Sequence, residues 1–288
     1  ETFPIWNLPL KHPVNLAYEA ATADLNDVNM IDPFHLEAYG ETTVNYNRDV
    51  EIFPVLRTIF ENILGQCPYK SPTDMGVNMA GNCIVDDEVC RQASRMEILR
   101  RYYATLTDRL QGKVDEELVY KLELLMKQAD VTTDLCPAIA ASLKREEATG
   151  APAGAMVLPD GQVVTGRTSD LLGASAALLL NALKRLGGID QDLDLISTHV
   201  LEPICRLKTG VLGNKNPRLH SDEVLIALCV SALTNPIAAM AQAQLPKLRG
   251  CDAHFTVVLS DVDEKLYRRL GIHVSCEPKY ERQRLYFK

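Results

Sequence analysis

The sequence lacks the short motifs that mark the common catalytic and metal centres. It has no H-E-x-x-H string, no G-x-x-x-x-G-K-[ST] phosphate loop, no G-x-G-x-x-G fingerprint and no G-x-S-x-G elbow. These absences remove support for a zinc hydrolase, a P-loop or Rossmann nucleotide site, and an α/β-hydrolase. No metal motif is present, since the six histidines lie far apart without a second His or Cys at ligand spacing: His12, His35, His199, His220, His254 and His273.

The sequence also lacks the features of an exported or membrane-spanning chain. Its eight cysteines form no C-x-x-C pair and no regular framework, so they are expected to be reduced thiols. Its apolar runs fall short of the roughly 20 residues that a bilayer requires, and Glu1–Pro4 does not resemble a signal peptide. We therefore expect a cytoplasmic location and no membrane partner.

Positive charge is scarce and scattered. The formal net charge is −8, and no block of consecutive Lys or Arg occurs. Phosphate backbones and anionic lipids are held by extended basic surfaces, so nucleic acid is not an expected partner. In such an acidic chain, the few loops that gather cations become informative.

The length of 288 residues predicts two domains. The first, residues 1–148, is expected to be a mainly helical region whose start completes an upstream α/β domain. Apolar spacing predicts helices over 14–25, 48–64, from 86 or 87 to 110, and 114–126, with a possible strand at Met30 and Ile31. Between Thr132 and Pro152 the apolar pattern weakens and prolines interrupt it, which places the boundary there.

The second domain, residues 149–288, is predicted to be α/β (α+β), a sheet flanked by helices. Residues 153–158 and 162–165 flank Asp160-Gly161, a pair that tolerates the backbone angles of a tight hairpin turn. Strands are expected at 254–259 and 272–276. The helices are expected at 173–186, 198–207, 222–233, 236–244 and 261–270.

Three polar loops combine glycine, hydroxyl or amide side chains and cations, which together suit an anion such as a phosphate or carboxylate. The alternative is that their Gly, Asn and Asp residues only satisfy turns and helix caps. For the third loop the two interpretations are evenly matched, and for the first two the structural one is favoured. The candidate ligands are Lys70, Ser71, Thr73, Asp74 and Asn78 in the first loop, Arg167, Thr168 and Ser169 in the second, and Lys208, Asn214, Lys215, Arg218 and His220 in the third.

Long and unusual strings at 3–16, 69–81 and 213–220 closely resemble a bacterial family, uncharacterised protein family 0371 or domain of unknown function 1846. The resemblance covers essentially the whole chain. It implies that the chain is the C-terminal portion of a longer protein, with a glycine-rich, P-loop-like segment upstream of Glu1. It lends no established catalytic residues.

A second resemblance concerns the hairpin and the apolar helix over 153–186, which look like the opening of the cytidine-deaminase fold. Zinc deaminases carry a His or Cys ligand at the helix start and a later P-C-x-x-C. Here the helix starts Gly173-Ala174-Ser175, and no P-C-x-x-C follows. The resemblance therefore implies the fold without its zinc site.

Two functions remain open from the sequence. The first is an enzyme or binding protein for a nucleotide or phosphorylated small metabolite, in which ATP or another nucleotide is held with the help of an upstream phosphate-binding region. The second is a non-catalytic binding or assembly protein that forms a homo-oligomer through apolar helices such as 222–233. Whether the protein is an enzyme stays undecided at this level.

Overall fold

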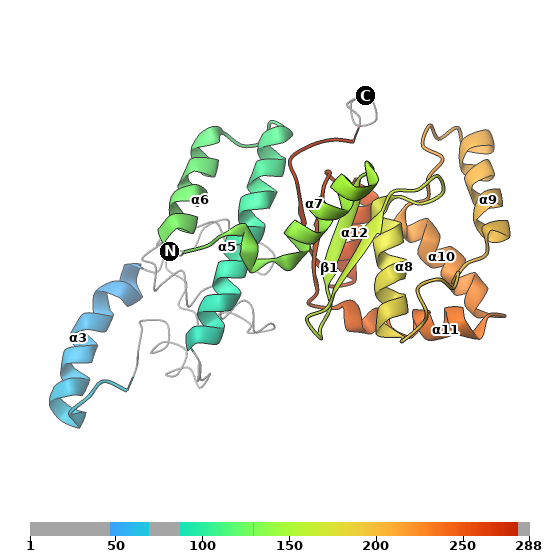
Figure 1. Cartoon of the computed structure of the whole chain (residues 1–288). Coiled ribbons are helices and arrows are strands. Elements are labelled where there is room, and N and C mark those ends of the chain that lie inside the picture. Colours follow the sequence, from blue (N-terminus) through green and yellow to red (C-terminus); the bar gives the residue numbers. More distant parts are fainter. Residues whose placement is uncertain (1–46, 69–86, 129, 282–288) are drawn as a thin grey trace. The chain divides into compact units, whose positions relative to one another are not determined.

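The computed structural model describes residues 47–68, 87–128 and 130–281 of the chain (Figure 1). Its contacts divide the chain into two compact units. One contains Glu1–Leu99 with Leu122–Val131, and the other contains Arg100–Lys121 with Thr132–Lys288. The predicted division at residue 148 stays a prediction.

The described part of the first half is helical, as the apolar spacing predicted. Three long helices occupy it, and they match the predicted ranges to within two residues at each end. The expected helix at 14–25, the possible strand at Met30 and Ile31 and the first polar loop lie outside the described residues. The three helices are α3 (Asn47–Leu64), α5 (Asp87–Leu110) and α6 (Glu116–Gln128).

The second unit is built on a mixed sheet of four strands in the order β2-β1-β3-β4. The hairpin forms as predicted, with Ala153 opposite Arg167 and Val157 opposite Val163. Strand β1 is antiparallel to β3, and β3 is parallel to β4. The strands are β1 (Ala153–Val157), β2 (Val163–Arg167), β3 (Asp252–Phe255) and β4 (His273–Cys276).

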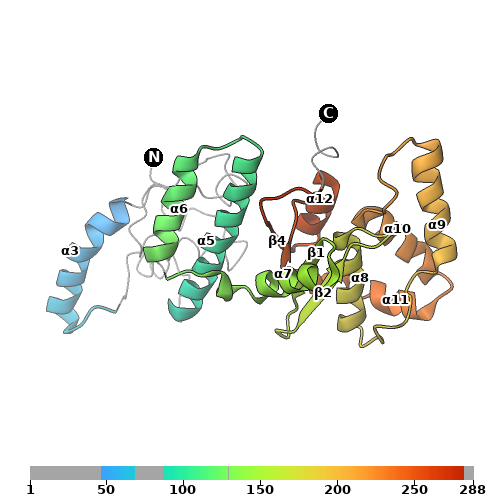
Figure 2. The ribbon, with the colours of Figure 1, turned by 45° about the horizontal axis from the view of Figure 1, so that its top comes forward.

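Helices cover both faces of this sheet, which confirms the α/β class. Side chains alternate along a strand. Gly154 of β1 faces Phe255 and Leu178, on the side where α8 (Ala174–Leu186) and α12 (Asp261–Arg269) pack. Figure 2 lets the reader follow these helices around β1 and β2.

The other face of the sheet is covered by α7 (Pro137–Thr149), a helix that the sequence analysis did not predict. The weak apolar pattern at 132–152 was interpreted as a boundary, and that interpretation missed this element. Pro137 stands in the first turn, where its missing N–H costs nothing, and Gly150 closes the helix with a φ of 65°. The buried side of α7 carries only small or single apolar residues, Ala138, Ile139 and Ser142, so its amphipathic signal is faint.

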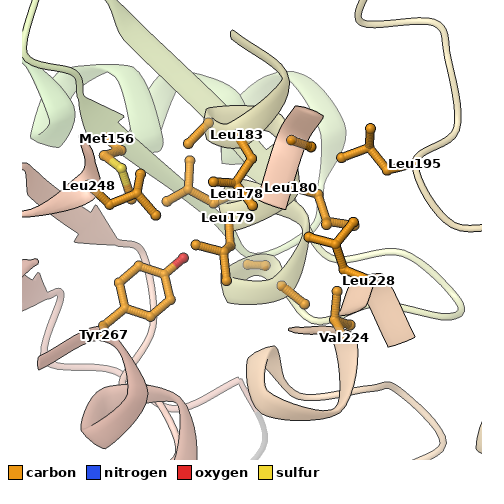
Figure 3. Packing of buried hydrophobic residues seen from close by; sticks show 14 of the residues in the cluster. Met156, Leu178, Leu179, Leu180, Leu183, Leu195, Val224, Leu228, Leu248 and Tyr267 are labelled. Carbon is orange, nitrogen blue, oxygen red and sulfur yellow. The ribbon is translucent and has the colours of Figure 1, made fainter. Parts of the chain in front are cut away.

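The core lies between the sheet and the helices of the second half. Leu178, Leu179 and Leu183 of α8 are fully buried there, as Figure 3 shows. The hydroxyl of Tyr267 on α12 donates to the carbonyl of Ser175 at 2.7 Å, so the only polar atom of this buried ring is satisfied. The remaining helices of the second half are α9 (Thr198–Arg206), α10 (Ser221–Ala232) and α11 (Pro236–Gln242).

Candidate functional site

The structure brings the second and third polar loops together. Leu172 and Leu219 form an isolated parallel bridge. The Leu219 amide donates to the Leu171 carbonyl at 2.8 Å, and the Gly173 amide donates to the Leu219 carbonyl at 3.3 Å. The chain therefore enters α8 and α10 side by side. The first loop, with Lys70, Ser71, Thr73, Asp74 and Asn78, lies outside the described residues.

Lys208 lies inside the third loop. A π-helical turn, Leu207–Val211, follows α9 directly and turns this lysine inward, where its side chain is 2% exposed. Its Nζ donates to the Arg218 carbonyl at 2.7 Å and to Glu223 Oε2 at 2.7 Å. Lys208 thus closes the loop from within, and its charge is neutralised by Glu223.

The other cations of the third loop have different surroundings. Arg218 Nη1 donates to Glu281 Oε1 at 2.6 Å, so this guanidinium is also paired. Lys215 and Asn214 are exposed at the tip of the loop, and the Asn214 amide donates to the Lys208 carbonyl at 3.0 Å. Of the predicted permanent cations in this loop, Lys215 is the one directed to solvent.

His220 is the last residue of the third loop before α10 begins. Its Nδ1 lies 2.9 Å from Asp263 Oδ2 and 3.3 Å from Ser260 Oγ. Asp263 is held in turn by the Ser260 hydroxyl at 2.7 Å and by the Ser221 amide at 2.8 Å. The imidazole is 28% exposed, and within the described residues its Nε2 has no protein partner.

The His220–Asp263 pair has a defined charge state. Burial alone would raise the pKa of Asp263, but the hydrogen bond and charge of His220, with the bonds from Ser221 and Ser260, lower it to about 2. The hydrogen bond to Asp263 raises the pKa of His220 above 6.5, although burial opposes it. The pair is therefore an imidazolium beside a carboxylate over the weakly acid range.

Three helices begin at this place. His220 precedes α10, Ser260 caps α12 by accepting the Asp263 amide at 3.2 Å, and Gly173 precedes α8. Helix N-termini carry unpaired amides and partial positive charge, which favours a carboxylate or another anion. The Ser221 side chain is fully buried, and its Oγ finds no hydrogen-bond partner in the described part of the chain.

The polar groups of the second loop mainly stabilise the loop itself and offer few donors to a ligand. Arg167 is exposed, and its Nη1 donates to the Thr168 carbonyl at 3.2 Å. Thr168 is buried, with its amide donating to the Pro152 carbonyl at 2.8 Å. The Ser169 hydroxyl accepts the Leu172 amide at 3.1 Å. Thr168 and Ser169 thus satisfy the turn, as the structural alternative predicted.

Four partners of the third loop were missed in the sequence: Glu223, Ser260, Asp263 and Glu281. Ser260 and Asp263 have the spacing of a helix cap, and that pattern was visible. Nothing in the sequence indicates that Asp263 also reaches back to His220, 43 positions earlier.

A second histidine cluster lies against the sheet. His254 of β3 is fully buried, with Nδ1 2.8 Å from Ser275 Oγ and Nε2 3.2 Å from Glu277 Oε1. The ring of Tyr103 on α5 meets it edge to face at a centroid distance of 4.7 Å. Both ring nitrogens are used and the imidazole is closed off from solvent, so this network holds the end of α5 that contains Tyr103 against β3.

Within residues 47–68, 87–128 and 130–281, no three His, Cys, Asp or Glu side chains gather as a metal site. Over the same ranges, none of the helices has the length and apolar content to cross a membrane.

Comparison with known proteins gives the family of the chain. A model described as domain of unknown function DUF1846, N-terminal, matches residues 1–130, and its C-terminal counterpart matches residues 134–286. The chain belongs to this family. The expectation that the chain is the C-terminal portion of a longer protein stays a prediction.

Relatives from several bacteria support the assignment. A UPF0371 protein of Corynebacterium efficiens is 57% identical over 288 residues, and one of Streptococcus thermophilus is 55% identical over 288 residues. One of Streptococcus pneumoniae is 56% identical over 289 residues. Each match covers 100% of the chain, which spans 58% of the length of each of these family members.

Proposed function

We propose that the chain holds a small anionic metabolite, a nucleotide or another phosphorylated compound, against His220 where the second and third loops meet. One observation carries the proposal: Asp263 fixes the imidazole and its charge, while the side chain of His220 is 28% exposed and its Nε2 has no protein partner in the described ranges. A cytoplasmic location belongs to the same proposal. Binding and catalysis are both compatible with it.

The physical basis is a charge-assisted hydrogen bond. A protonated imidazole donates its Nε2–H to a phosphate oxygen, and such bonds are roughly twice as strong as neutral ones. Lys215 is exposed on the same loop and supplies a second cation. In this proposal, further phosphate contacts come from sequence that the longer relatives have outside the matched part.

Titration calorimetry with inorganic phosphate and with ATP tests the proposal. We expect His220→Gln and Lys215→Ala each to weaken binding by about tenfold, which corresponds to the loss of one charge-assisted contact. Lys247→Ala is the matched control, since Lys247 is an exposed lysine on another segment. Equal affinity in wild type and His220→Gln would remove the site assignment.

A second candidate function is assembly without catalysis, and the outer side of α10 favours it. Ile226 is 65% exposed, Val230 57% and Leu233 83%, at a spacing that places them along one stripe. No charged side chain interrupts this stripe from Ile226 to Leu233. Such a surface fits a second copy of the chain. A stable oligomer in solution that shows no thermal shift with any nucleotide or phosphorylated metabolite would favour this candidate over the first.

The likeness to the cytidine-deaminase fold also remains a proposal. The hairpin of β1 and β2 followed by the apolar helix α8 supports it. Gly173, Ala174 and Ser175 stand at the helix start, so the proposal includes no zinc chemistry. A structure of a longer relative whose sheet continues differently beyond α8 would remove the likeness.

A further inference from the structure

His220 differs from its neighbouring cations in a way that binding alone does not require. The loop neutralises two permanent cations, Lys208 with Glu223 and Arg218 with Glu281. His220, whose side chain can lose its proton near neutral pH, stays partly exposed. A lysine or arginine at this position would bind an anion equally well. The special property of an imidazole is proton transfer.

The orientation of the ring suits that role. Asp263 takes Nδ1 at 2.9 Å, so only Nε2 remains to face a ligand. Asp263 is itself fixed by the Ser221 amide and the Ser260 hydroxyl, which leaves the carboxylate little freedom to turn. A carboxylate behind a histidine sets the ring orientation and stabilises its protonated form. Asp263 is therefore a positioning residue.

The charged groups facing the ring come from three elements. Asp263 lies on α12, Lys208 on the π-helical turn and Glu223 on α10. Glu223 Oε2 accepts hydrogen bonds from Lys208 Nζ and from the His220 amide, so the charges of Glu223 and Lys208 neutralise each other. Asp263 is the charged group that bonds directly to the imidazole, and it keeps the proton on the ring in the weakly acid range.

We propose that His220 is a general acid that protonates the ester oxygen of a bound phosphate monoester, with Asp263 positioning its ring. This inference rests on the proposed binding of a phosphorylated metabolite. Water adds to phosphorus as the P–O bond to the metabolite breaks, and the Nε2 proton passes to the leaving oxygen. The attacking water then returns a proton to Nε2. Phosphate ester and water thus give alcohol and inorganic phosphate.

Two substrates with different leaving groups test the role of His220 in the intact chain. β-Glycerophosphate releases a poor leaving group that requires protonation, whereas p-nitrophenyl phosphate releases a stable phenolate. General-acid catalysis contributes about 10²–10⁴-fold. We expect His220→Gln to lower kcat for β-glycerophosphate by about 10²-fold or more and for p-nitrophenyl phosphate by less than about tenfold. His199→Gln, which changes an exposed histidine of α9, should alter neither rate.

The pH profile separates a positioning role of Asp263 from a merely structural one. Asp263→Asn should move the alkaline limb of kcat to lower pH, because the imidazolium loses its counter-charge. An equal loss on both substrates in His220→Gln, or an unchanged alkaline limb in Asp263→Asn, overturns the inference. If inorganic phosphate binds and neither ester is hydrolysed, the inference fails while the proposed function stands. If phosphate does not bind, the proposed function fails first.

Discussion

Asp263 accepts hydrogen bonds from His220, Ser221 and Ser260, and its charge makes the local stability depend on pH. Its pKa falls from 3.8 to about 2 in the folded chain. Its contribution is therefore complete above pH 3.8 and is lost as the pH falls through 2. His220, with its pKa raised above 6.5, contributes below 6.5 and loses its contribution as the pH rises through the folded value.

We therefore expect Asp263→Asn to lower the free energy of unfolding most between about pH 4 and 6.5, where both contributions are present. The shift of Asp263 corresponds to about 2 kcal/mol of unfolding free energy. Urea unfolding at pH 5.5 and pH 2 measures the difference between wild type and variant, which should shrink at the lower pH. A pH-independent difference would show that the hydrogen-bond geometry matters and the charge does not.

Lys208 tests the internal closure of the third loop. Lys208→Met leaves Glu223 and the Arg218 carbonyl without their common donor, and removing one partner of a buried pair costs about 3 kcal/mol. The matched control is Lys215→Met, an exposed lysine seven positions later, which should change stability by less than about 0.5 kcal/mol. Chemical denaturation at pH 7 compares the two variants. Similar losses would mean that the ion pair adds nothing to the fold.

At the scale of elements, Gly166 sets how closely α8 approaches the sheet. A Cβ atom at this position of β2 would lie 2.3 Å from the Leu178 amide nitrogen, a contact with backbone that cannot rotate away. We expect Gly166→Ala to destabilise the chain by about 3 kcal/mol through overpacking. Gly210→Ala is the control, because nothing lies within 4 Å of its added methyl group. Thermal unfolding compares the two variants. A loss of stability in Gly166→Ala alone would come from the close contact with α8, whereas equal losses would come from replacing glycine in general.

The elements that the sequence predicted share a strong periodic signal. The hairpin turn at Asp160-Gly161 and the apolar run of α8 were visible because local chemistry and burial agree there. Helix α7 was missed because its buried side is mostly small. The π-helical turn at Leu207–Val211 was missed because its burial of Lys208 depends on Glu223 and Arg218, which follow in the sequence.

In the candidate site too, the sequence predicted local features and missed contacts between distant segments. His220 and its loop were predicted from composition, whereas the contact between the second and third loops was not. Lys208 and Arg218 were expected to face a ligand, yet both are paired with carboxylates, because an acidic chain offers each cation a nearby internal partner. Asp263 came from a distant helix. Pairings over long sequence separations are set by the whole fold, so loop composition alone cannot assign them.

At the scale of the whole molecule, the stripe on α10 predicts self-association. Replacing Ile226 and Val230 by Glu places charges in the apolar stripe, and a shared interface would then separate into monomers. Light scattering across a concentration series measures the mass, and we expect the dissociation constant to rise by at least about tenfold. Leu143→Glu, a change at an exposed leucine on α7, should leave the mass unchanged. A monomeric wild type would remove assembly from the candidate functions.

The π-helical turn after α9 carries one residue more per turn than an α-helix would use. Deleting Gly210 would remove this extra residue, so the bond from the Leu212 amide to the Leu207 carbonyl would close an ordinary helical turn and the chain would continue in nearly the same direction. Asn214, Lys215 and His220 would then stay close to their present positions. In this family, the loss of one residue within this segment would therefore disturb the site less than a substitution at Lys208 or His220, which make the bonds that hold the loop.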